Sequence, residues 1–322
     1  MGGARVLLGE VQGVEGLKVS VIIPCVKRDE LFDRCVRSIE RSVAAARGCD
    51  VEHELVVVEG VSPVGAARNE GLRRATGDWI AWVDADDEVL QDWFADISRI
   101  LKTRPDADVL VTDVENVGWE GCADCEWEVP PGAVPVERFL FDFYHGHNLT
   151  VNVWQYVTRR DLWKGLEFDE SVCMGEDYQI SHLVLRRASN CIRIGRKLYR
   201  YHCNPGSLMN GGCRIDADEQ DRVADRRLKL VTSDYRRAAV WGVGTDRYWI
   251  ADLAALSGQD CERARRARSW IRRHFLSLLV ESVFGRHLSF CDRRVWPFRF
   301  LSAALDCWWV QVRHARKRRA CR

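Results

Sequence analysis

The stretch Trp79-Ile-Ala-Trp-Val-Asp-Ala-Asp-Asp87 places three carboxylates directly after a short apolar run. Trp79 to Val83 has the length and composition of a buried strand. Asp84, Asp86 and Asp87 follow where that strand would meet solvent, and three like charges repel one another unless a cation or hydrogen-bond donors offset them. Mg²⁺ or Mn²⁺ suits such oxygen ligands and leaves positions open for substrate phosphates. The alternative is an acidic loop that only starts the next helix.

Strand-like and helix-like segments alternate on both sides of this stretch. The expected strands cover 19–23, 54–58, 79–83 and 108–112, and the expected helices cover about 31–43, 66–75 and 90–101. This alternation predicts an α/β fold with a parallel sheet covered on both faces. Ligands bind beyond the carboxyl ends of such strands, so Pro24-Cys25, Glu59-Gly60 and Asp84 to Asp87 should meet at one crevice.

A second acidic pair, Glu176-Asp177, follows Gly175 and precedes an apolar stripe that contains Ile180, Leu183 and Val184. The spacing predicts a helix with both acids in its first turn. A carboxylate at a helix N-terminus is held ionised by the helix dipole, which suits a general base. The same position equally suits a simple helix cap.

Four pieces of sequence in a fixed order resemble the family 2 inverting glycosyltransferases, whose nucleotide-sugar domain has the GT-A fold. They are Val19-Ser-Val-Ile-Ile-Pro24; Ala67-Arg-Asn-Glu-Gly71 with Ala75-Thr-Gly-Asp78; Asp84-Ala-Asp-Asp87; and Phe168-Asp-Glu170 with Gly175-Glu-Asp177 and Leu198-Tyr-Arg-Tyr201. The resemblance covers about 19–208. It implies a GT-A type, Rossmann-like and mostly parallel domain at 18–210. Residues 1–17 contain five glycines and no strong period, which predicts a loose leader, and the helical pattern after the match fades predicts a basic helical extension at 211–322.

The resemblance also implies a role for each site residue. The catalytic residues would be Asp177, as the base that deprotonates the acceptor hydroxyl, and Glu176; the nucleotide-sugar contacts would be Pro24, Glu59, Arg68, Asn69 and Asp84; the metal ligands would be Asp86, Asp87 and His202. Two of these positions keep an alternative. Arg68 either approaches the diphosphate or forms a structural salt bridge. His202 is either a metal ligand or an ordinary core or surface histidine.

The chain departs from the family pattern at three places. Cys25-Val26-Lys27 stands where family members have an aromatic-Asn pair, and Glu59 stands where Asp is usual. Only seven residues separate Glu59 from Ala67, too few for the helix and strand often found there. We therefore expect a trimmed nucleotide-binding sheet.

Charge and cysteine usage suggest where the protein works. The net charge is only +1, yet from Cys261 onward sixteen Lys and Arg residues face four Asp and Glu residues. The thirteen cysteines are odd in number and scattered, which favours free thiols in a reducing cytosol. Cys122 and Cys125 form a lone CxxC, for which two ordinary thiols are expected rather than a zinc or redox site. No apolar run is long enough to cross a bilayer.

The C-terminal region combines basic residues with two apolar stripes at helical spacing. The stripes are Trp270, Ile271, Phe275, Leu278 and Leu279, and then Leu301, Ala304, Leu305, Trp308 and Val312. Such helices suit an anionic membrane surface, which would place the protein in the cytoplasm at the inner face of the plasma membrane. The alternative is that the stripes pack on the catalytic domain. Nucleic acid is not expected as a partner.

Together these features predict a metal-assisted transferase that uses a UDP-sugar to extend a glycan or a lipid-linked saccharide. A sugar nucleotidyltransferase would need a Gly-rich loop after the first strand, and Pro24 to Glu30 contains no glycine. A dinucleotide oxidoreductase would need a GxGxxG motif there, which is also missing. A non-catalytic, glycosyltransferase-like scaffold at the membrane remains the alternative from another class.

Overall fold

The computed structural model describes most of the chain. The described residues are 17–46, 48–118, 130–145, 152–173, 175–204, 217–244, 247 and 262–284. Three features discussed above lie outside them: the leader at 1–16, the CxxC of Cys122 and Cys125, and the second apolar stripe at 301–312.

Eight strands form one sheet in the order β2-β1-β3-β7-β5-β8-β4, with β6 paired to β8. They are β1 (Lys18–Cys25), β2 (Glu52–Glu59), β3 (Trp79–Trp82), β4 (Glu88–Val89), β5 (Val109–Val117), β6 (Gly132–Pro135), β7 (Tyr156–Arg159) and β8 (Asn190–His202). Strands β1, β2, β3, β5 and β8 run in one direction, and β4, β6 and β7 run against them. The sheet is therefore mixed but mostly parallel.

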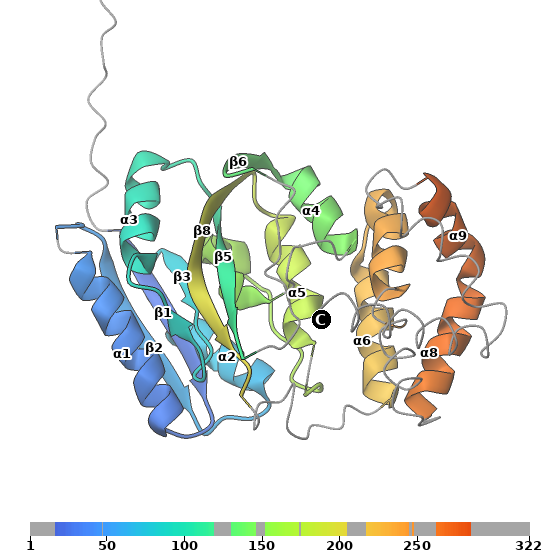
Figure 1. The fold of residues 1–322 in the computed structure, drawn as a ribbon, viewed down its shortest axis with the longest axis horizontal. Helices are drawn as coiled ribbons and strands as arrows, with labels where there is room; N and C mark the ends of the chain where they lie inside the picture. Colours follow the sequence, from blue (N-terminus) through green and yellow to red (C-terminus); the bar gives the residue numbers. More distant parts are fainter. Residues whose placement is uncertain are drawn as a thin grey trace, which may run out of the picture.

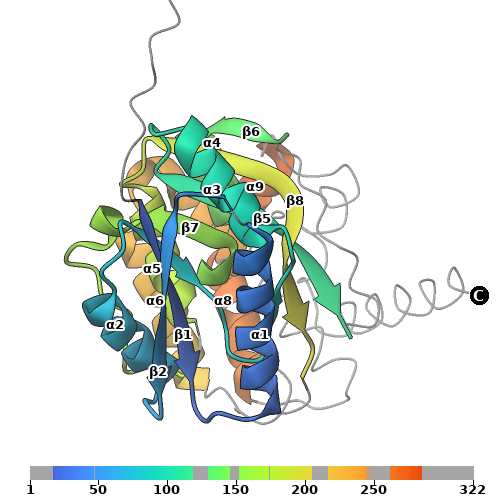
Figure 2. The same cartoon turned by 90° about the vertical axis from the view of Figure 1, so that its left-hand side faces the viewer.

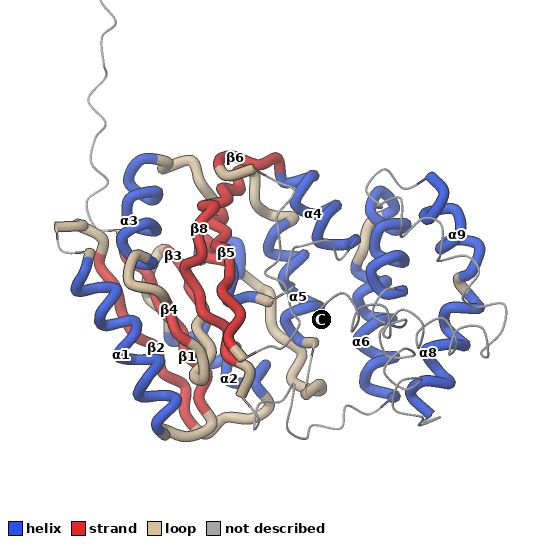
Figure 3. Tube along the Cα trace, viewed as in Figure 1, coloured by secondary structure: helices blue, strands red, loops and turns tan. Residues whose placement is uncertain are grey.

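Helices cover both faces of this sheet. They are α1 (Glu30–Ala45), α2 (Val64–Arg74), α3 (Trp93–Thr103), α4 (Val136–His145), α5 (Glu176–Leu185), α6 (Ala217–Leu230), α8 (Glu262–Arg273) and α9 (Phe275–Phe284), with short 3-10 turns η1 (Val153–Gln155), η2 (Arg160–Trp163) and η3 (Ser233–Tyr235). Figure 1 shows α1 and α3 on one side of the sheet and α4 and α5 on the other. Helices α6, α8 and α9 stand beyond α5, within the expected C-terminal extension (Figure 3).

Helix α1 shows how local sequence builds these elements. Its N-cap Asp29 accepts hydrogen bonds from the backbone N–H groups of Leu31 and Phe32. Such a cap pairs donors that the helix itself leaves unbonded. Phe32, Cys35 and Ile39 recur at helical spacing and are buried, so one face of the helix packs into the core.

The four strands and the helices expected before residue 113 are confirmed, but four strands, β4, β6, β7 and β8, were not predicted. Strand β4 has only two residues, and β7 joins β3 to β5 by antiparallel pairing that no sequence period signals. Strand β6 lies at an edge of the sheet, where it pairs antiparallel with β8. Glycine and proline at the ends of this four-residue edge strand conceal its pattern.

The described C-terminal helices fit the packing alternative for the first apolar stripe. Trp270, Ile271 and Leu278 are buried, so these members of the stripe face the protein and not its surroundings. Leu278 also packs closely on Gly244, where a Cβ would lie 2.6 Å from Leu278 Cδ2. Within the described ranges, no helix is both long enough and apolar enough to span a bilayer.

Helix α2 approaches β1 so closely that glycine is required at the contact. A Cβ added to Gly71 would collide with Cγ2 of Ile22, which is fully buried in β1. Gly77, between α2 and β3, also leaves no room for a side chain, because a Cβ there would lie 2.7 Å from Lys18 O and from Ser20 N. Glycine at 71 thus lets the helix that carries Arg68 and Asn69 lie directly on the strand.

Replacing Gly71 with Ala should destabilise the fold by about 1–3 kcal/mol, because the added methyl overpacks the contact with Ile22. Chemical denaturation measures the change in the free energy of unfolding. Arg74→Ala on the exposed side of the same helix is the matched control and should stay within about 0.5 kcal/mol of the parent. Equal stability of Gly71→Ala and the parent would contradict this packing.

Candidate active site

The strand order reverses at β1, which creates the crevice expected from the sequence. Strands β2 and β3 both pair with β1 in parallel, one on each side, so three carboxyl ends lie next to one another. Figure 2 shows β1 and β2 side by side. Cys25 stands opposite Glu59 in the register, and the Val83 N–H donates to Ile22 O at 3.0 Å. Ligands of open α/β sheets bind at such a reversal, so the Asp84–Asp87 segment lies at the position where a ligand is expected.

Asp84 to Asp87 forms a tight turn, closed by a hydrogen bond from Asp87 N to Asp84 O at 3.0 Å. Two side chains from distant elements hold the turn from outside. Arg34 of α1 donates from Nη2 to Asp86 O at 2.6 Å. Asn204, just after β8, donates from Nδ2 to Asp86 Oδ2 at 3.0 Å. The turn is thus fixed on both sides, and its carboxylates have defined directions.

Asp87 faces into the protein. It is fully buried, and its carboxylate accepts hydrogen bonds from the Tyr199 hydroxyl and from His202 N, each at 2.8 Å. Burial first, and then the nearby charges of Asp84 and Asp86, raise the pKa of Asp87 to about 9. Asp87 therefore anchors the turn from within.

The His202 ring is paired with a carboxylate inside the protein. Its Nε2 lies 2.8 Å from Glu88 Oε2, with the ring mostly buried. Among the described residues, no group of three or more His, Cys, Asp or Glu side chains is arranged to hold a metal ion. Asp87 and His202 are thus engaged inside the protein, and a metal site of Asp86, Asp87 and His202 stays a prediction.

Asp84 and Asp86 remain as carboxylates at the edge of the crevice. Both side chains are only partly buried. Burial and the charge of Asp84 raise the pKa of Asp86, which shows that the two carboxylates repel each other at close range. Mg²⁺ is commonly held by one or two carboxylates together with substrate phosphates, so this pair fits a metal site that a diphosphate completes.

Arg68 connects this turn to the second acidic pair. It is only 3% exposed, and its Nη2 lies 3.1 Å from Asp84 Oδ1 while its Nη1 forms an ion pair with Glu176. The guanidinium also lies over the Phe168 ring, 5.6 Å from its centroid. Arg68 therefore forms the structural salt bridge that was one of its two expected roles. This bridge brings the second acidic pair, which is far away in sequence, next to Asp84.

Glu176 and Asp177 begin α5, as predicted. Gly175 precedes them in the left-handed conformation, with φ of 83°. Glu176 is buried in its contact with Arg68, whereas Asp177 remains partly exposed. Burial and the charge of Glu176 raise the pKa of Asp177 well above its ordinary value, with a smaller contribution from Asp84. Asp177 thus lies within electrostatic reach of the turn that contains Asp84.

Asn69 has a different role from the nucleotide contact that was expected. It is buried, and its Nδ2 donates to Phe168 O at 3.0 Å and to Glu170 Oε1 at 2.9 Å. Its Oδ1 accepts from Phe168 N at 2.8 Å. The amide is satisfied within the protein and fastens the Phe168–Glu170 segment to α2, so we correct its assignment to a structural one.

Pro24 and Glu59 lie at the strand ends where they were expected. Pro24 is buried within β1, opposite Val58. Glu59 is exposed at the tip of β2, and its carboxylate pairs with Arg28 Nε at 2.9 Å. Glu59 can therefore reach a ligand above the sheet, and Arg28 adds a positive charge that the sequence analysis did not consider.

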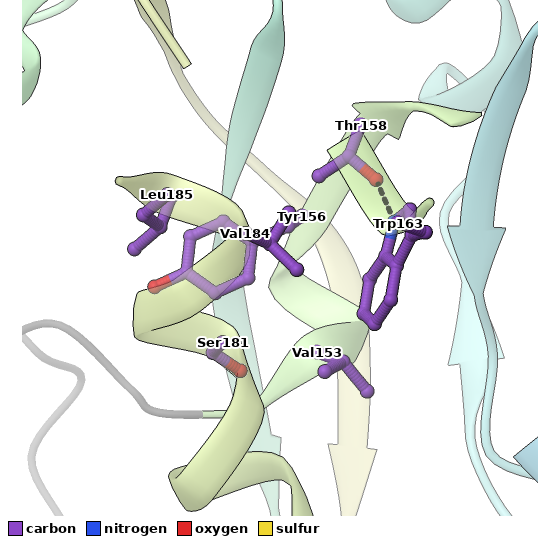
Figure 4. A pocket seen from close by; sticks show the side chains of 7 residues that line it. All are labelled: Val153, Tyr156, Thr158, Trp163, Ser181, Val184 and Leu185. Atoms are coloured by element: carbon purple, nitrogen blue, oxygen red, sulfur yellow. Dashed lines mark hydrogen bonds between the residues drawn. The ribbon is translucent and has the colours of Figure 1, made fainter. Parts of the chain in front are cut away.

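A small cavity of about 10 Å³ lies behind α5 and is separate from the carboxylates (Figure 4). Its lining is mainly apolar: Val153, Tyr156, Thr158, Trp163, Ser181, Val184 and Leu185. The Trp163 indole N–H donates to Thr158 Oγ1 at 2.8 Å, so this polar pair is satisfied. A space of this size holds about one water molecule, so it is a packing defect and not a substrate site.

Part of this crevice lies within a segment that matches a known family. The family model described as "Glycosyl transferase family 2" matches residues 52–153, which include Glu59, Arg68 and the Asp84–Asp87 turn. The chain is 24% identical over 227 residues to the uncharacterized glycosyltransferase EpsJ of Bacillus subtilis (strain 168), covering 59% of this chain and 62% of EpsJ. It is 27% identical over 207 residues to the succinoglycan biosynthesis protein ExoO of Rhizobium meliloti (strain 1021), covering 60% and 55%. The match thus spans less than two thirds of either relative.

Solved structures share the fold. The structure of S. aureus TarS 1-349 matches with a TM-score of 0.55 at 14% identity, covering 82% of this chain and 80% of that one. The same protein in complex with UDP-GlcNAc matches with a TM-score of 0.52 at 15% identity, covering 80% and 92%. The mixed, mostly parallel sheet with flanking helices is therefore the GT-A type fold expected from the sequence.

The family model covers the ends of β2 and β3, and the relatives extend the match over more than half of the chain. Residues 52–153 of this chain thus match the family 2 glycosyltransferases, and the fold is of the GT-A type.

Proposed function

We propose that this protein transfers a sugar from a nucleotide-sugar donor to a hydroxyl of a glycan or a lipid-linked saccharide, with inversion at the anomeric carbon. One observation carries the proposal. Arg68 joins Asp84, at the expected nucleotide site, to Glu176, which directly precedes Asp177. Groups suited to hold a donor and a group suited to deprotonate an acceptor thereby share one crevice.

A UDP-sugar is the proposed donor. The fold matches a structure of TarS in complex with UDP-GlcNAc, and the crevice lies at the same kind of strand reversal that binds nucleotides in other α/β proteins. Glu59 at the tip of β2 would contact the base and ribose region. Asp84, held by Arg68, would contact the ribose. The relative ExoO is a succinoglycan biosynthesis protein, which is consistent with a saccharide acceptor for this chain.

Mg²⁺ or Mn²⁺ would be held by Asp86, with Asp84 beside it, and by the donor diphosphate. Bound there, the ion neutralises the charge that develops on the leaving nucleoside diphosphate. Asp86 suits this role because its repulsion from Asp84 is relieved by a cation. Asp87 and His202 contribute indirectly, by fixing the turn from below.

Asp177 is the proposed general base. The acceptor hydroxyl gives its proton to the Asp177 carboxylate while its oxygen bonds to the anomeric carbon, on the face opposite the leaving group. The bond from that carbon to the nucleoside diphosphate breaks in the same step. The raised pKa of Asp177 suits this work, because a more basic carboxylate accepts a proton more readily once it is ionised. Glu176 holds Arg68 and thereby orients the first turn of α5.

Asp177→Asn should lower the rate of sugar transfer by about 10²–10⁴-fold, because the amide cannot accept the proton. Mass spectrometry of products from a panel of UDP-sugars measures transfer, and calorimetry measures UDP binding, which should be retained. Asp106→Asn, a carboxylate outside the crevice that pairs with Arg104, is the matched control and should leave transfer unchanged. Undiminished turnover in Asp177→Asn would assign the base elsewhere.

UDP should raise the melting temperature only when Mn²⁺ is present. At about a hundred times Kd, binding contributes roughly 2.7 kcal/mol to stability. Asp86→Asn should remove the part of the shift that depends on Mn²⁺, because it removes the proposed ligand. If no nucleoside diphosphate shifts the parent protein with either metal, the non-catalytic scaffold alternative is favoured.

We also propose that the protein works in the cytoplasm, peripherally bound to the anionic inner face of the plasma membrane. The buried stripe leaves the opposite side of α8 and α9 exposed, where Leu276 is 74% and Val280 is 42% exposed. Arg265, Arg272 and Arg273 are exposed on the same pair of helices. Apolar and cationic groups together suit anionic headgroups. Cys25, Cys35, Cys49 and Cys191 are free thiols, which agrees with a reducing compartment.

Arg272→Ala combined with Arg273→Ala should weaken binding to vesicles that contain phosphatidylserine by roughly 30-fold, because each cation near such a surface contributes about 1 kcal/mol. Vesicle co-sedimentation at constant salt measures this. The control removes two arginines from α2, Arg73 and Arg74, both exposed. Equal binding by the two double variants would show that α8 does not face the membrane.

A further inference from the structure

Tyr199 of β8 lies directly beneath the turn that contains Asp84 and Asp86. Its hydroxyl donates to Asp87 Oδ2 at 2.8 Å and accepts from the Asp84 N–H at 3.1 Å. One oxygen therefore bonds to the first and last residues of the turn. Both contacts come from a residue more than a hundred positions later in the chain.

The Tyr199 ring is held as firmly as its hydroxyl. The side chain is fully buried and stacks on Trp154 of η1, with centroids 4.5 Å apart and planes inclined by 11°. Trp154 also stacks on Tyr201, at 5.3 Å and 22°. Because these rings fix the plane of the phenol, the hydroxyl oxygen has one defined position below the turn.

The two bonds act on different parts of the turn. The bond from the Asp84 N–H fixes the backbone at the start of the turn, where the Asp84 side chain leaves toward Arg68. The bond to Asp87 fixes the buried end, together with the His202 N–H. Asp86 lies between these two points, so its direction is set by both. Without the hydroxyl, a buried N–H would lack its partner and a buried carboxylate would lose one, and the turn would move to recover them.

We propose that Tyr199 is a positioning residue for donor binding, whose hydroxyl sets the direction in which Asp84 and Asp86 face the nucleotide-sugar. This inference rests on the proposed function for its consequence, though not for its geometry. Tyr199 does not touch the donor and acts through the turn. Its hydroxyl bonds to Asp84 and Asp87 and, within the part of the chain that the structure describes, to no residue of the first turn of α5, so its effect should fall on the donor side of the reaction.

Tyr199→Phe tests the inference, because it keeps the stacked ring and removes only the hydroxyl. We expect the KM for the UDP-sugar and the half-saturating Mn²⁺ concentration each to rise by about tenfold or more, as for loss of a hydrogen bond to a charged group. The KM for the acceptor should change by less than about twofold. A tyrosine that only filled the core would not separate the two KM values in this way.

A second measurement requires no substrate. Hydrogen exchange followed by mass spectrometry should show faster exchange in the peptide containing Asp84 to Asp87 in Tyr199→Phe than in the parent, because the Asp84 N–H loses its acceptor. Thr158→Val is the control, since it removes a buried hydroxyl of β7 that bonds to Trp163 and lies away from the turn. It should leave both the exchange of this peptide and the donor KM unchanged.

The outcomes separate this inference from the proposed function. If the parent protein neither binds UDP nor transfers a sugar, the proposed function fails, and hydrogen exchange alone decides whether Tyr199 holds the turn. If transfer is observed but Tyr199→Phe changes neither the exchange nor the donor KM, the inference is overturned and the function stands. Should Tyr199→Phe not fold, Trp154→Phe replaces it. Loosening the ring stack should then produce the same donor-side change, and no such change would overturn the inference.

Discussion

The buried guanidinium of Arg68 is the interaction on which the site depends. A charge so far from water is tolerated only when it is paired, and Arg68 is paired twice, with Asp84 and with Glu176. Removal of either carboxylate would leave the other pair to offset the whole cost of burying the cation. The two ion pairs of Arg68 thus hold the end of β3 next to the start of α5. The Phe168 ring packs beneath the guanidinium and adds to this contact.

Repulsion between the crowded carboxylates is the second constraint, and each of these residues is compensated by different neighbours. Asp87 is buried and accepts hydrogen bonds from the Tyr199 hydroxyl and the His202 N–H, and Asp84 pairs with the Arg68 guanidinium. Asp86 has a weaker partner in the Asn204 amide and keeps a raised pKa. The residue with the least internal compensation is therefore the one best suited to an external cation. Asp177 is in a similar state on the other side of Arg68, where the proposed chemistry needs a carboxylate that accepts a proton.

Sequence reasoning predicted the parts of the fold that depend on local periodicity. Strands β1, β2, β3 and β5 and the helices after them follow from apolar runs and helical spacing, and their order was enough to predict which strand ends converge. Strand β7 could not be found in this way, because its pairing between β3 and β5 is decided by tertiary contacts. At the site, the motifs located Asp84 and Asp177 but not the internal hydrogen bonds that occupy Asn69, Asp87 and His202. Tyr199 was quoted within a motif without a role, since only its position under the turn reveals one.

The amide of Asn69 has a consequence for how the protein unfolds. By clasping Phe168 and Glu170 through both its oxygen and its nitrogen, it makes α2 and the approach to α5 a single mechanical unit. Helix α2 and the Phe168–Glu170 segment should unfold only together, because breaking these hydrogen bonds would expose the Phe168 ring and the Arg68 guanidinium above it. Thermal unfolding should therefore be cooperative, so that the proposed donor side and the proposed acceptor side of the crevice are lost together.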